Sequence, residues 1–364
     1  MIPRMKSPQK KSRVAVLGAT GMVGQQYISL LDNHPWFDVT HVVASPSSAG
    51  KTYAEAVTGR WHMKHALPES VRNLVVHTVD DLDAVKKNCD FVFSALDSDI
   101  AKEWEEKYAA AGIPVVSNAS THRMTPDVPM IIPEVNPEHL DMIPVQQKNR
   151  GYSKGFIVVK PNCSIQSYVA PLAALKEKFG LKHVVVTTMQ AVSGAGHPGV
   201  ASLDILENVI PLIKGEEEKS ELEPRKIFGS IKGKAIVSDE SFTISAHCNR
   251  VPTLDGHLAC VSFSCDTKPT EKEILAAWKA FSGPPQELDL PSAPRQAITY
   301  REEANRPQPR LDRDNDKGMT VSVGRLREDP VFHWKFVGLS HNTIRGAAGG
   351  GVLIAELLKA KSYV

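Results

Sequence analysis

The hydrophobic and polar positions at the start of the chain predict one βαβ unit. An apolar run at 14–17 is followed by a glycine-rich stretch at 18–24, a helical pattern at 25–32 and a second apolar run at 39–44. Short apolar runs bounded by turn residues are typical of buried strands, and the spacing between these two runs is that of a helix. A strand, a crossover helix and a second strand form the first unit of a parallel sheet.

The same alternation continues to about residue 156. Further apolar runs occur at 74–76, 91–93 and 115–116, and a helix-like segment occupies 100–111. Strands that alternate with helices are typical of a parallel sheet covered on both faces. We therefore expect an α/β fold, with a Rossmann-type doubly wound domain over 1–156 that is completed by an apolar helix within 343–364.

The pattern changes over 157–342 and predicts a second, α+β domain. It contains longer β-rich runs, two apolar helical segments and two polar stretches that are loops or exposed segments. The runs are 184–189, 242–247, 258–265 and 319–325, the helical segments lie around 200–213 and 272–282, and the polar stretches are 214–223 and 301–317.

Charge and cysteine content narrow the class of partner. Lys and Arg total 43 against 41 Asp and Glu, which favours neither nucleic acid nor an anionic membrane. Five cysteines without a CxxC pair indicate a reducing compartment and no metal site. We expect a soluble, cytoplasmic protein with small-molecule ligands, preceded by a solvated basic arm at 1–13.

The stretch Gly18-Ala19-Thr20-Gly21-Met22-Val23-Gly24 follows a strand and opens a helix. Glycines there let the backbone approach a pyrophosphate, which the free N–H groups and the helix dipole bind. The spacing is GxxGxxG rather than GxGxxG, and a purely structural turn is the alternative. Its place in a βαβ unit favours dinucleotide binding, with Gly18, Thr20, Gly21, Met22, Val23 and Gly24 as contacts.

The end of the second predicted strand favours NADP over NAD. Residues 44–51 read ASPSSAGK and lack the acid that would hold a free ribose 2′-OH. They offer hydroxyls and a cation for a 2′-phosphate instead. An ordinary Ser/Gly loop would have the same composition.

Cys163 is the candidate nucleophile. Pro161-Asn162-Cys163-Ser164 lies between a predicted strand and a helical pattern at 165–179, which Pro171 should kink or restart. A helix N-terminus lowers a thiol pKa and presents N–H groups to an oxyanion. The remaining cysteines are expected in the core; they are Cys89, Cys248, Cys260 and Cys265. His257, after a turn, is either a proton-transferring group or a turn residue.

Eight motifs in order along nearly the whole chain resemble those of aspartate-semialdehyde dehydrogenases, particularly the fungal and archaeal branch. They are GATGMVG at 18–24, ASPSSAGK at 44–51, SNASTHRM at 117–124, PNCS at 161–164, MQAVSGAGHPG at 189–199, EEEK at 216–219, CNRVPTLDGH at 248–257 and HNTIRGAAGG at 341–350. The resemblance implies a fold like that of glyceraldehyde-3-phosphate dehydrogenase, in which the second domain serves catalysis and dimerisation.

The resemblance also implies roles for individual residues. In catalysis, Cys163 would be the nucleophile, His257 the acid/base, Gln190 would orient the substrate carbonyl and Asn162 would steady the oxyanion. For the substrate, Arg250 would hold the α-carboxylate, Arg123 and Lys219 the phosphate, and Glu217 the α-ammonium group, although three consecutive glutamates leave that register open. For the cofactor, the implied contacts are Ser45 and Ser48 at the 2′-phosphate, Ser94 and Leu96 beside it, and Gly194 and Asn342 near the nicotinamide.

The implied reaction is the NADPH-dependent reductive dephosphorylation of L-aspartyl 4-phosphate to L-aspartate 4-semialdehyde through a Cys163 thioester. It would serve lysine, threonine, methionine and isoleucine biosynthesis in a homodimer or homotetramer. Two rival hypotheses are a reductase of another acyl substrate, such as N-acetylglutamyl phosphate or malonyl-CoA, and a non-catalytic NADP-sensing protein. A carboxylate facing the substrate amine argues against the first, and the presence of the Cys, His and Arg against the second.

Overall fold

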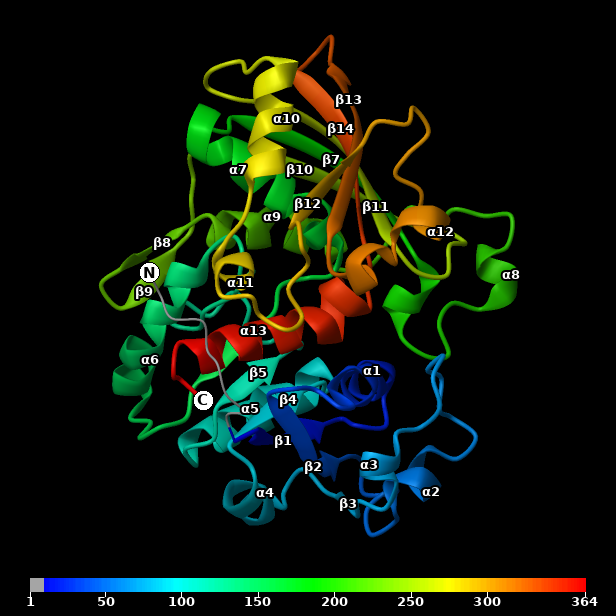
Figure 1. The fold of residues 1–364 in the computed structure, drawn as a ribbon, viewed down its shortest axis with the longest axis vertical. Helices are drawn as coiled ribbons and strands as arrows, with labels where there is room; N and C mark the ends of the chain where they lie inside the picture. The colour runs from blue at the N-terminus through cyan, green and yellow to red at the C-terminus, as the bar shows by residue number, and fades with distance from the viewer. Residues whose placement is uncertain (1–9) are drawn as a thin grey trace.

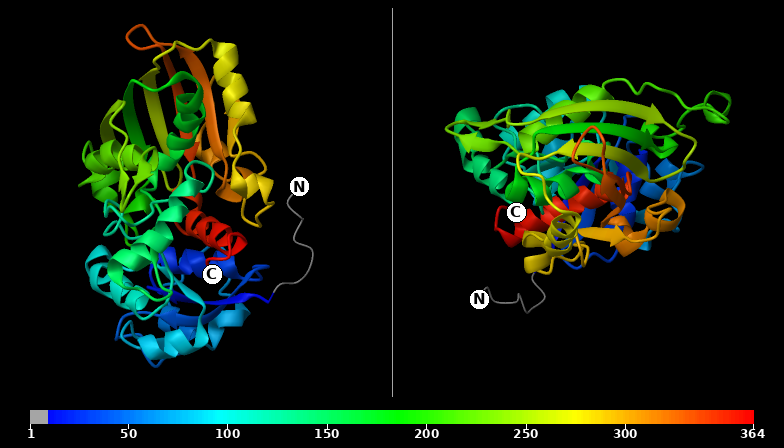
Figure 2. Two further views of the ribbon diagram at one scale, coloured as in Figure 1. Left: turned by 90° about the vertical axis from the view of Figure 1, so that its left-hand side faces the viewer. Right: turned by 90° about the horizontal axis from the view of Figure 1, so that it is seen from above.

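The computed structural model describes residues 10–364 and contains two six-stranded sheets that lie one above the other in Figure 1. Helix α13 (Gly349–Ala360) crosses between them, and Figure 2 shows the same two lobes from the side. The expected pairing of a doubly wound α/β domain with a mixed-sheet domain is confirmed.

The first sheet is parallel throughout and has the strand order β3-β2-β1-β4-β5-β6. The strands are β1 (Ser12–Leu17), β2 (Phe37–Val43), β3 (Val76–His77), β4 (Phe91–Ser94), β5 (Val115–Ser117) and β6 (Ile157–Val159). The boundary expected at residue 156 falls too early for this sheet, because β6 pairs with β5 through Ile157 and Val115. The run 157–159 is apolar because all three residues of β6 are buried.

Helices cover both faces of this sheet. They are α1 (Met22–Leu31), α2 (Tyr53–Val57), α3 (Glu69–Arg72), α4 (Leu82–Asn88), α5 (Ser98–Ala110), a 3-10 turn (Pro137–Met142) and α6 (Ile143–Arg150). The apolar C-terminal helix α13 packs on α1 and β5, as expected, and its side chains from Val352 to Leu358 are buried in one core with β1 and β2. The nucleotide-type domain is therefore built from both ends of the chain.

The second sheet is mixed and has the order β10-β7-β11-β14-β13-β12. Its strands are β7 (His183–Gln190), β10 (Thr243–Arg250), β11 (His257–Ser264), β12 (Ile298–Arg301), β13 (Val321–Glu328) and β14 (Trp334–Ser340), and a small hairpin joins β8 (Ser230–Lys232) to β9 (Ala235–Val237). Helices α7 (Val169–Phe179) and α10 (Glu271–Ala280) cover one face, with α11 (Pro284–Glu287) and α12 (Pro309–Asp312) nearby.

Two segments differ from their prediction. The segment 200–213 holds a single helical turn, α8 (Ser202–Ile205), because most of its apolar side chains face outward instead of packing. The charged stretch 214–223 is largely the helix α9 (Glu216–Ile227) rather than a loop. Three glutamates in its first turn suit the positive end of the helix dipole.

The structure also bears on the basic arm, on Cys260 and on membrane-spanning helices. Most of the basic arm at 1–13 lies outside the described residues, and from Ser12 onward the chain is already strand β1. Cys260 is exposed rather than buried, because it points to the outer face of β11, where side chains alternate between faces. Within residues 10–364, the helices are all too short or too polar to cross a bilayer.

Candidate active site

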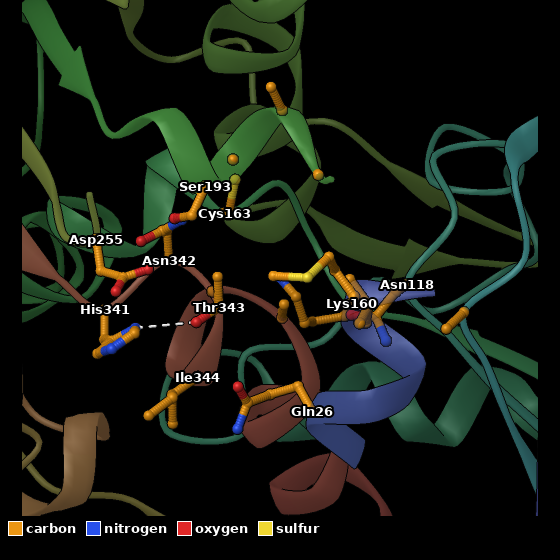
Figure 3. A pocket seen from close by; sticks show the side chains of 18 of the residues that line it. Gln26, Asn118, Lys160, Cys163, Ser193, Asp255, His341, Asn342, Thr343 and Ile344 are labelled. Atoms are coloured by element: carbon orange, nitrogen blue, oxygen red, sulfur yellow. Dashed lines mark hydrogen bonds between the residues drawn. The ribbon is translucent and has the colours of Figure 1, made fainter. Parts of the chain in front are cut away.

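A cavity of about 730 Å³ lies between the two domains. The first domain contributes the start of α1, the ends of β4 and β5, and residues 62–65. The second contributes Cys163, the loop around Gly194 and the segment that follows β14. Figure 3 shows Cys163, Ser193, Asn342 and Lys160 among the side chains on its wall. The cavity is where a ligand can contact both domains.

The glycine-rich loop closes tightly under one end of this cavity. Gly18 has φ +76°, and a Cβ there would lie 2.5 Å from the Ala95 carbonyl oxygen, so a side chain does not fit. A Cβ at Gly24 would overlap the Gly18 carbonyl oxygen. Helix α1 begins at Met22 without a side-chain cap, and both Met22 and Val23 line the cavity. Free N–H groups at this helix start suit a pyrophosphate.

The residues expected at a 2′-phosphate lie close to Arg60, a cation that was not predicted from the sequence. Ser45 and Ser47 share a hydrogen bond of 2.9 Å, and Ser48 accepts one of 2.9 Å from exposed Arg60. The buried hydroxyl of Ser94 donates to Glu105 at 2.6 Å, and Ser94 is not among the residues that line the cavity. Leu96 does line the cavity.

Cys163 lies at the second-domain end of the cavity and is partly exposed there. It precedes a 3-10 turn (Ser164–Ser167), after which α7 starts at Val169, so Pro171 stands in the first turn of a new helix where proline is tolerated. Asn162 Oδ1 accepts from the Ser164 N–H at 2.8 Å and fixes this corner. A side chain at Gly346 would strike Cys163 Cβ at 2.9 Å.

His257 is buried beside the cysteine, with Nε2 at 3.4 Å from Cys163 Sγ. The Ala191 N–H donates to His257 Nδ1 at 3.0 Å. Because Nδ1 accepts, the proton of the neutral imidazole is on Nε2 and faces the sulfur. Burial lowers the pKa of His257 to about 3, and the charges of Arg250, His341 and Lys160 act in the same direction. The ring is therefore neutral at physiological pH.

The charges around Cys163 oppose one another. Burial and the Glu216 carboxylate raise the pKa of the thiol, while the cations Lys160, Arg123 and Arg250 lower it. The net shift of the thiol pKa from these causes is upward. Loss of the thiol proton would be favoured by anything that brings these cations closer to the sulfur.

Helix α9 places Glu216, rather than Glu217, at the site. Glu216 is buried, accepts from Asn162 Nδ2 at 2.9 Å and from Lys219 Nζ at 3.0 Å, and lines the cavity with Lys219. Glu217 points away and accepts from the Cys248 N–H at 3.1 Å. Successive residues of a helix point in different directions, so only one of the three consecutive glutamates faces the cavity.

Arg123 is held by a glutamate that the sequence reading did not single out. Its Nη1 donates to buried Glu223 at 3.0 Å and its Nη2 to the Asn118 carbonyl at 2.9 Å. Glu223 also accepts from the Asn162 N–H at 2.6 Å. Glu216, Ser220 and Glu223 are four and three positions apart, so they lie on one face of a helix. This spacing is the signal in the sequence that could have identified both the helix and Glu223.

Gln190 and Arg250 lie directly behind the cavity wall. Gln190 Nε2 approaches Glu216 at 3.3 Å, and Arg250 Nη1 donates to the Ala191 carbonyl at 2.7 Å. A Cβ at Gly194 would lie 2.8 Å from Arg250 Nη1 and 3.1 Å from His257 Nε2, so this glycine keeps the approach to both open. Asn342 bridges the Gly256 N–H and Ser193 Oγ, each at 2.8 Å.

A glycine-rich strand-to-helix turn across a cavity from a cysteine–histidine pair is an arrangement typical of dinucleotide-dependent oxidoreductases. The family model "Semialdehyde dehydrogenase, NAD binding domain" matches residues 13–143, and "Semialdehyde dehydrogenase, dimerisation domain" matches 172–345. The nucleotide-binding domain is thus present, and the second match supports a homo-oligomer.

Individual relatives agree over nearly the whole chain. Aspartate-semialdehyde dehydrogenases of Methanothermobacter thermautotrophicus and Aspergillus fumigatus are each 48% identical, over 95% and 97% of this chain and 98% and 99% of theirs. The crystal structure of the Candida albicans enzyme with NADP has a TM-score of 0.89 at 42% identity, covering 98% of this chain and 100% of that one. The chain belongs to the aspartate-semialdehyde dehydrogenase family, with fungal and archaeal relatives, as the motifs predicted.

Proposed function

We propose that this chain is an NADP-dependent aspartate-semialdehyde dehydrogenase that works through a thioester on Cys163. The observation that carries the proposal is the Cys163 Sγ to His257 Nε2 contact of 3.4 Å at the second-domain end of the cavity. The opposite end is formed by the glycine-rich loop and the uncapped start of α1. A nucleophile and a dinucleotide site therefore share one cavity.

The residues of the first domain fit the dinucleotide. The N–H groups of Met22 and Val23 would hold the pyrophosphate, and Ser45, Ser48 and Arg60 the 2′-phosphate. Support for NADP comes from the hydrogen bond that already joins Arg60 to Ser48 and from the NADP in the Candida albicans crystal structure. Gly194 and Asn342 would bound the nicotinamide end. NADPH, when bound, supplies the hydride that reduces the thioester.

In the proposed mechanism, the Cys163 thiolate attacks the acyl carbon of L-aspartyl 4-phosphate, and phosphate leaves with the electrons of the carbon–oxygen bond. After reduction, the tetrahedral thiohemiacetal oxyanion on Cys163 collapses: the carbon–sulfur bond breaks, the aldehyde is released and the thiolate is restored. The sulfur needs no proton during this cycle. Nε2 of His257 would donate a hydrogen bond first to the sulfur and then to the oxyanion, because Nδ1 already accepts the Ala191 N–H and the ring proton is on Nε2.

The substrate would be held by charges from both sides of Cys163. Arg250 suits the α-carboxylate, since a guanidinium can donate two parallel hydrogen bonds. Glu216 suits the α-ammonium group and Arg123 with Lys219 the phosphate, while Asn162 and Gln190 keep Glu216 in place. The subunits are proposed to form a homodimer or homotetramer through the second domain.

The test is phosphate-dependent reduction of NADP with L-aspartate semialdehyde, followed by absorbance. Cys163→Ser should retain NADP binding and lose at least about three orders of magnitude in rate, because a serine hydroxyl is a far poorer nucleophile than a thiolate. Cys260→Ser is the matched control, since Cys260 is exposed on the outer face of β11 and outside the cavity. Substantial turnover by Cys163→Ser would refute the thioester, and a wild type without turnover would refute the substrate.

A further inference from the structure

Lys160 is a buried lysine that the proposed mechanism does not use. It directly follows β6, the edge strand of the first sheet, and its backbone N–H donates to the carbonyl of Ser117 in the neighbouring strand β5 at 2.8 Å. Only 2% of the residue is exposed, yet it lines the same cavity as Cys163. Figure 3 shows it on the wall close to Asn118.

A second buried lysine shows what a purely structural ammonium group looks like in this protein. Lys226 Nζ donates to three backbone carbonyls, those of Arg123, Thr125 and Val128, at 2.6, 2.7 and 2.8 Å. An ammonium group has three donors, so Lys226 is fully satisfied. Within the described residues, Lys160 Nζ has one hydrogen-bond acceptor, the Pro161 carbonyl. Two buried donors of Lys160 are therefore without a partner, at the wall of a cavity.

Arg123 provides the second half of the arrangement. Its Nε is also buried without a partner in the described structure, although its two Nη atoms are bound. Burial and the positive charge of Arg123 lower the pKa of Lys160 to about 7, with Arg345 acting in the same direction and Cys163 and Glu223 opposing. Glu223 already pairs with Nη1 of Arg123. The Nε–H of Arg123 and two donors of Lys160 remain without an acceptor, and buried donors of this kind are costly unless an anion accepts from them.

We propose that Lys160 is a phosphate-binding residue, whose ammonium group and Arg123 Nε together hold the phosphate that leaves the acyl phosphate. The inference rests on the proposed function for the identity of the anion. A phosphate has enough acceptor oxygens to satisfy Lys160, Arg123 and Lys219 at once. A substrate α-carboxylate is less suited, because Arg250 is available for it beside Gly194.

The variants are Lys160→Met, which keeps the length of the side chain without the charge, and Lys160→Arg, which keeps the charge. Lys176→Met is the matched control, since Lys176 pairs with Asp239 at 2.6 Å outside the cavity. In the phosphorylating direction, Lys160→Met should raise the KM for phosphate about ten- to hundredfold, as expected for a lost charged hydrogen bond. The KM for aspartate semialdehyde and for NADP should change less than about twofold, and Lys160→Arg should restore part of the phosphate affinity.

A second measurement does not depend on turnover. Inorganic phosphate should slow alkylation of Cys163 by iodoacetamide in the wild type, and this protection should disappear in Lys160→Met. The melting temperature of ligand-free Lys160→Met should stay equal or rise, because an uncompensated buried charge has been removed. Unchanged phosphate KM and unchanged protection would overturn the proposal. Lys160-dependent protection in a protein that does not turn over aspartate semialdehyde would keep the phosphate site and refute the function instead.

Discussion

The Ala191 N–H determines which nitrogen of His257 carries the proton. It donates to Nδ1 at 3.0 Å, and a protonated Nδ1 would meet that donor head-on. The imidazolium is therefore disfavoured by this contact as well as by burial, which agrees with the lowering of its pKa to about 3. A neutral ring with its proton toward Sγ can stabilise a thiolate but is poorly placed to accept the thiol proton.

This arrangement predicts the pH dependence of Cys163 alkylation. The thiolate is the reactive form and the thiol pKa is raised, so the rate should increase with pH until that pKa is reached. The increase should be less steep near pH 7, where Lys160 loses the charge that stabilises the thiolate. His257 should add no inflection near pH 6.5, because it does not gain a proton there. His257→Phe, which removes the Nε2–H donor, should shift the ascending limb to higher pH. A wild-type inflection between pH 6 and 7 that vanishes in His257→Phe would contradict the assigned proton.

At the scale of the element, the strands and glycine loop were predictable and the charged helix was not. Buried strands such as β4 and β5 are continuous apolar runs, and the loop before α1 has glycines that its close approach to Ala95 requires. By contrast, α9 has few apolar residues, and its buried face is largely polar because it packs against the site rather than against an apolar core. A composition rule that assigns charged runs to solvent fails at such a helix.

Part of the site could be predicted from the sequence, and part of it could not. Cys163, His257 and Asn162 meet as expected, because strand ends and a turn bring them together. Glu216, Glu223 and Arg60 were missed or misplaced, since their roles depend on helical phase and on contacts between segments far apart in the chain. The ligand roles given to these residues remain predictions.

Helix α9 provides a matched pair of variants, Glu216→Gln and Glu217→Gln. Glu216→Gln should raise the KM for aspartate semialdehyde at least about tenfold, because it removes the anion that would meet the α-ammonium group and places an amide N–H against the Asn162 donor. Glu217→Gln keeps an acceptor for the Cys248 N–H and should change KM less than about twofold. Melting curves of both variants show whether the helix is intact. A larger effect at Glu217 would overturn the assignment.

At the scale of the whole molecule, the segment that leads into α13 lies at the cavity, and α13 itself packs on the N-terminal helix α1. The segment after β14 passes Asn342 and Gly346 at the cavity wall and then enters α13, which packs on α1 and α11. The C-terminal helix thus joins the nucleotide domain to the second domain next to the nucleophile. Gly346 has no room for a side chain, because a Cβ there would lie 2.9 Å from Cys163 Cβ.

The second domain also carries an apolar surface that a lone subunit would expose. Leu203, Leu206, Val209 and Leu212 are between 53% and 91% exposed on one short segment. They lie within the residues matched by the dimerisation-domain model, and α8 extends to one side of the molecule in Figure 1. A cluster of exposed large apolar side chains marks a contact surface. The apolar residues of this segment led to the prediction of a helix. We expect that they instead contact a second subunit.

Sedimentation of the wild type and of the double variant Leu206→Asp/Leu212→Asp tests this surface. Each buried leucine contributes about 1.5–3 kcal/mol, so the two together should weaken association by about two to four orders of magnitude and yield smaller species at micromolar concentration. Val331→Asp is the control, because Val331 is 80% exposed but stands alone in the turn between β13 and β14. An unchanged mass for the double variant would place the subunit contact elsewhere, with the outer face of the second sheet as the next surface to substitute.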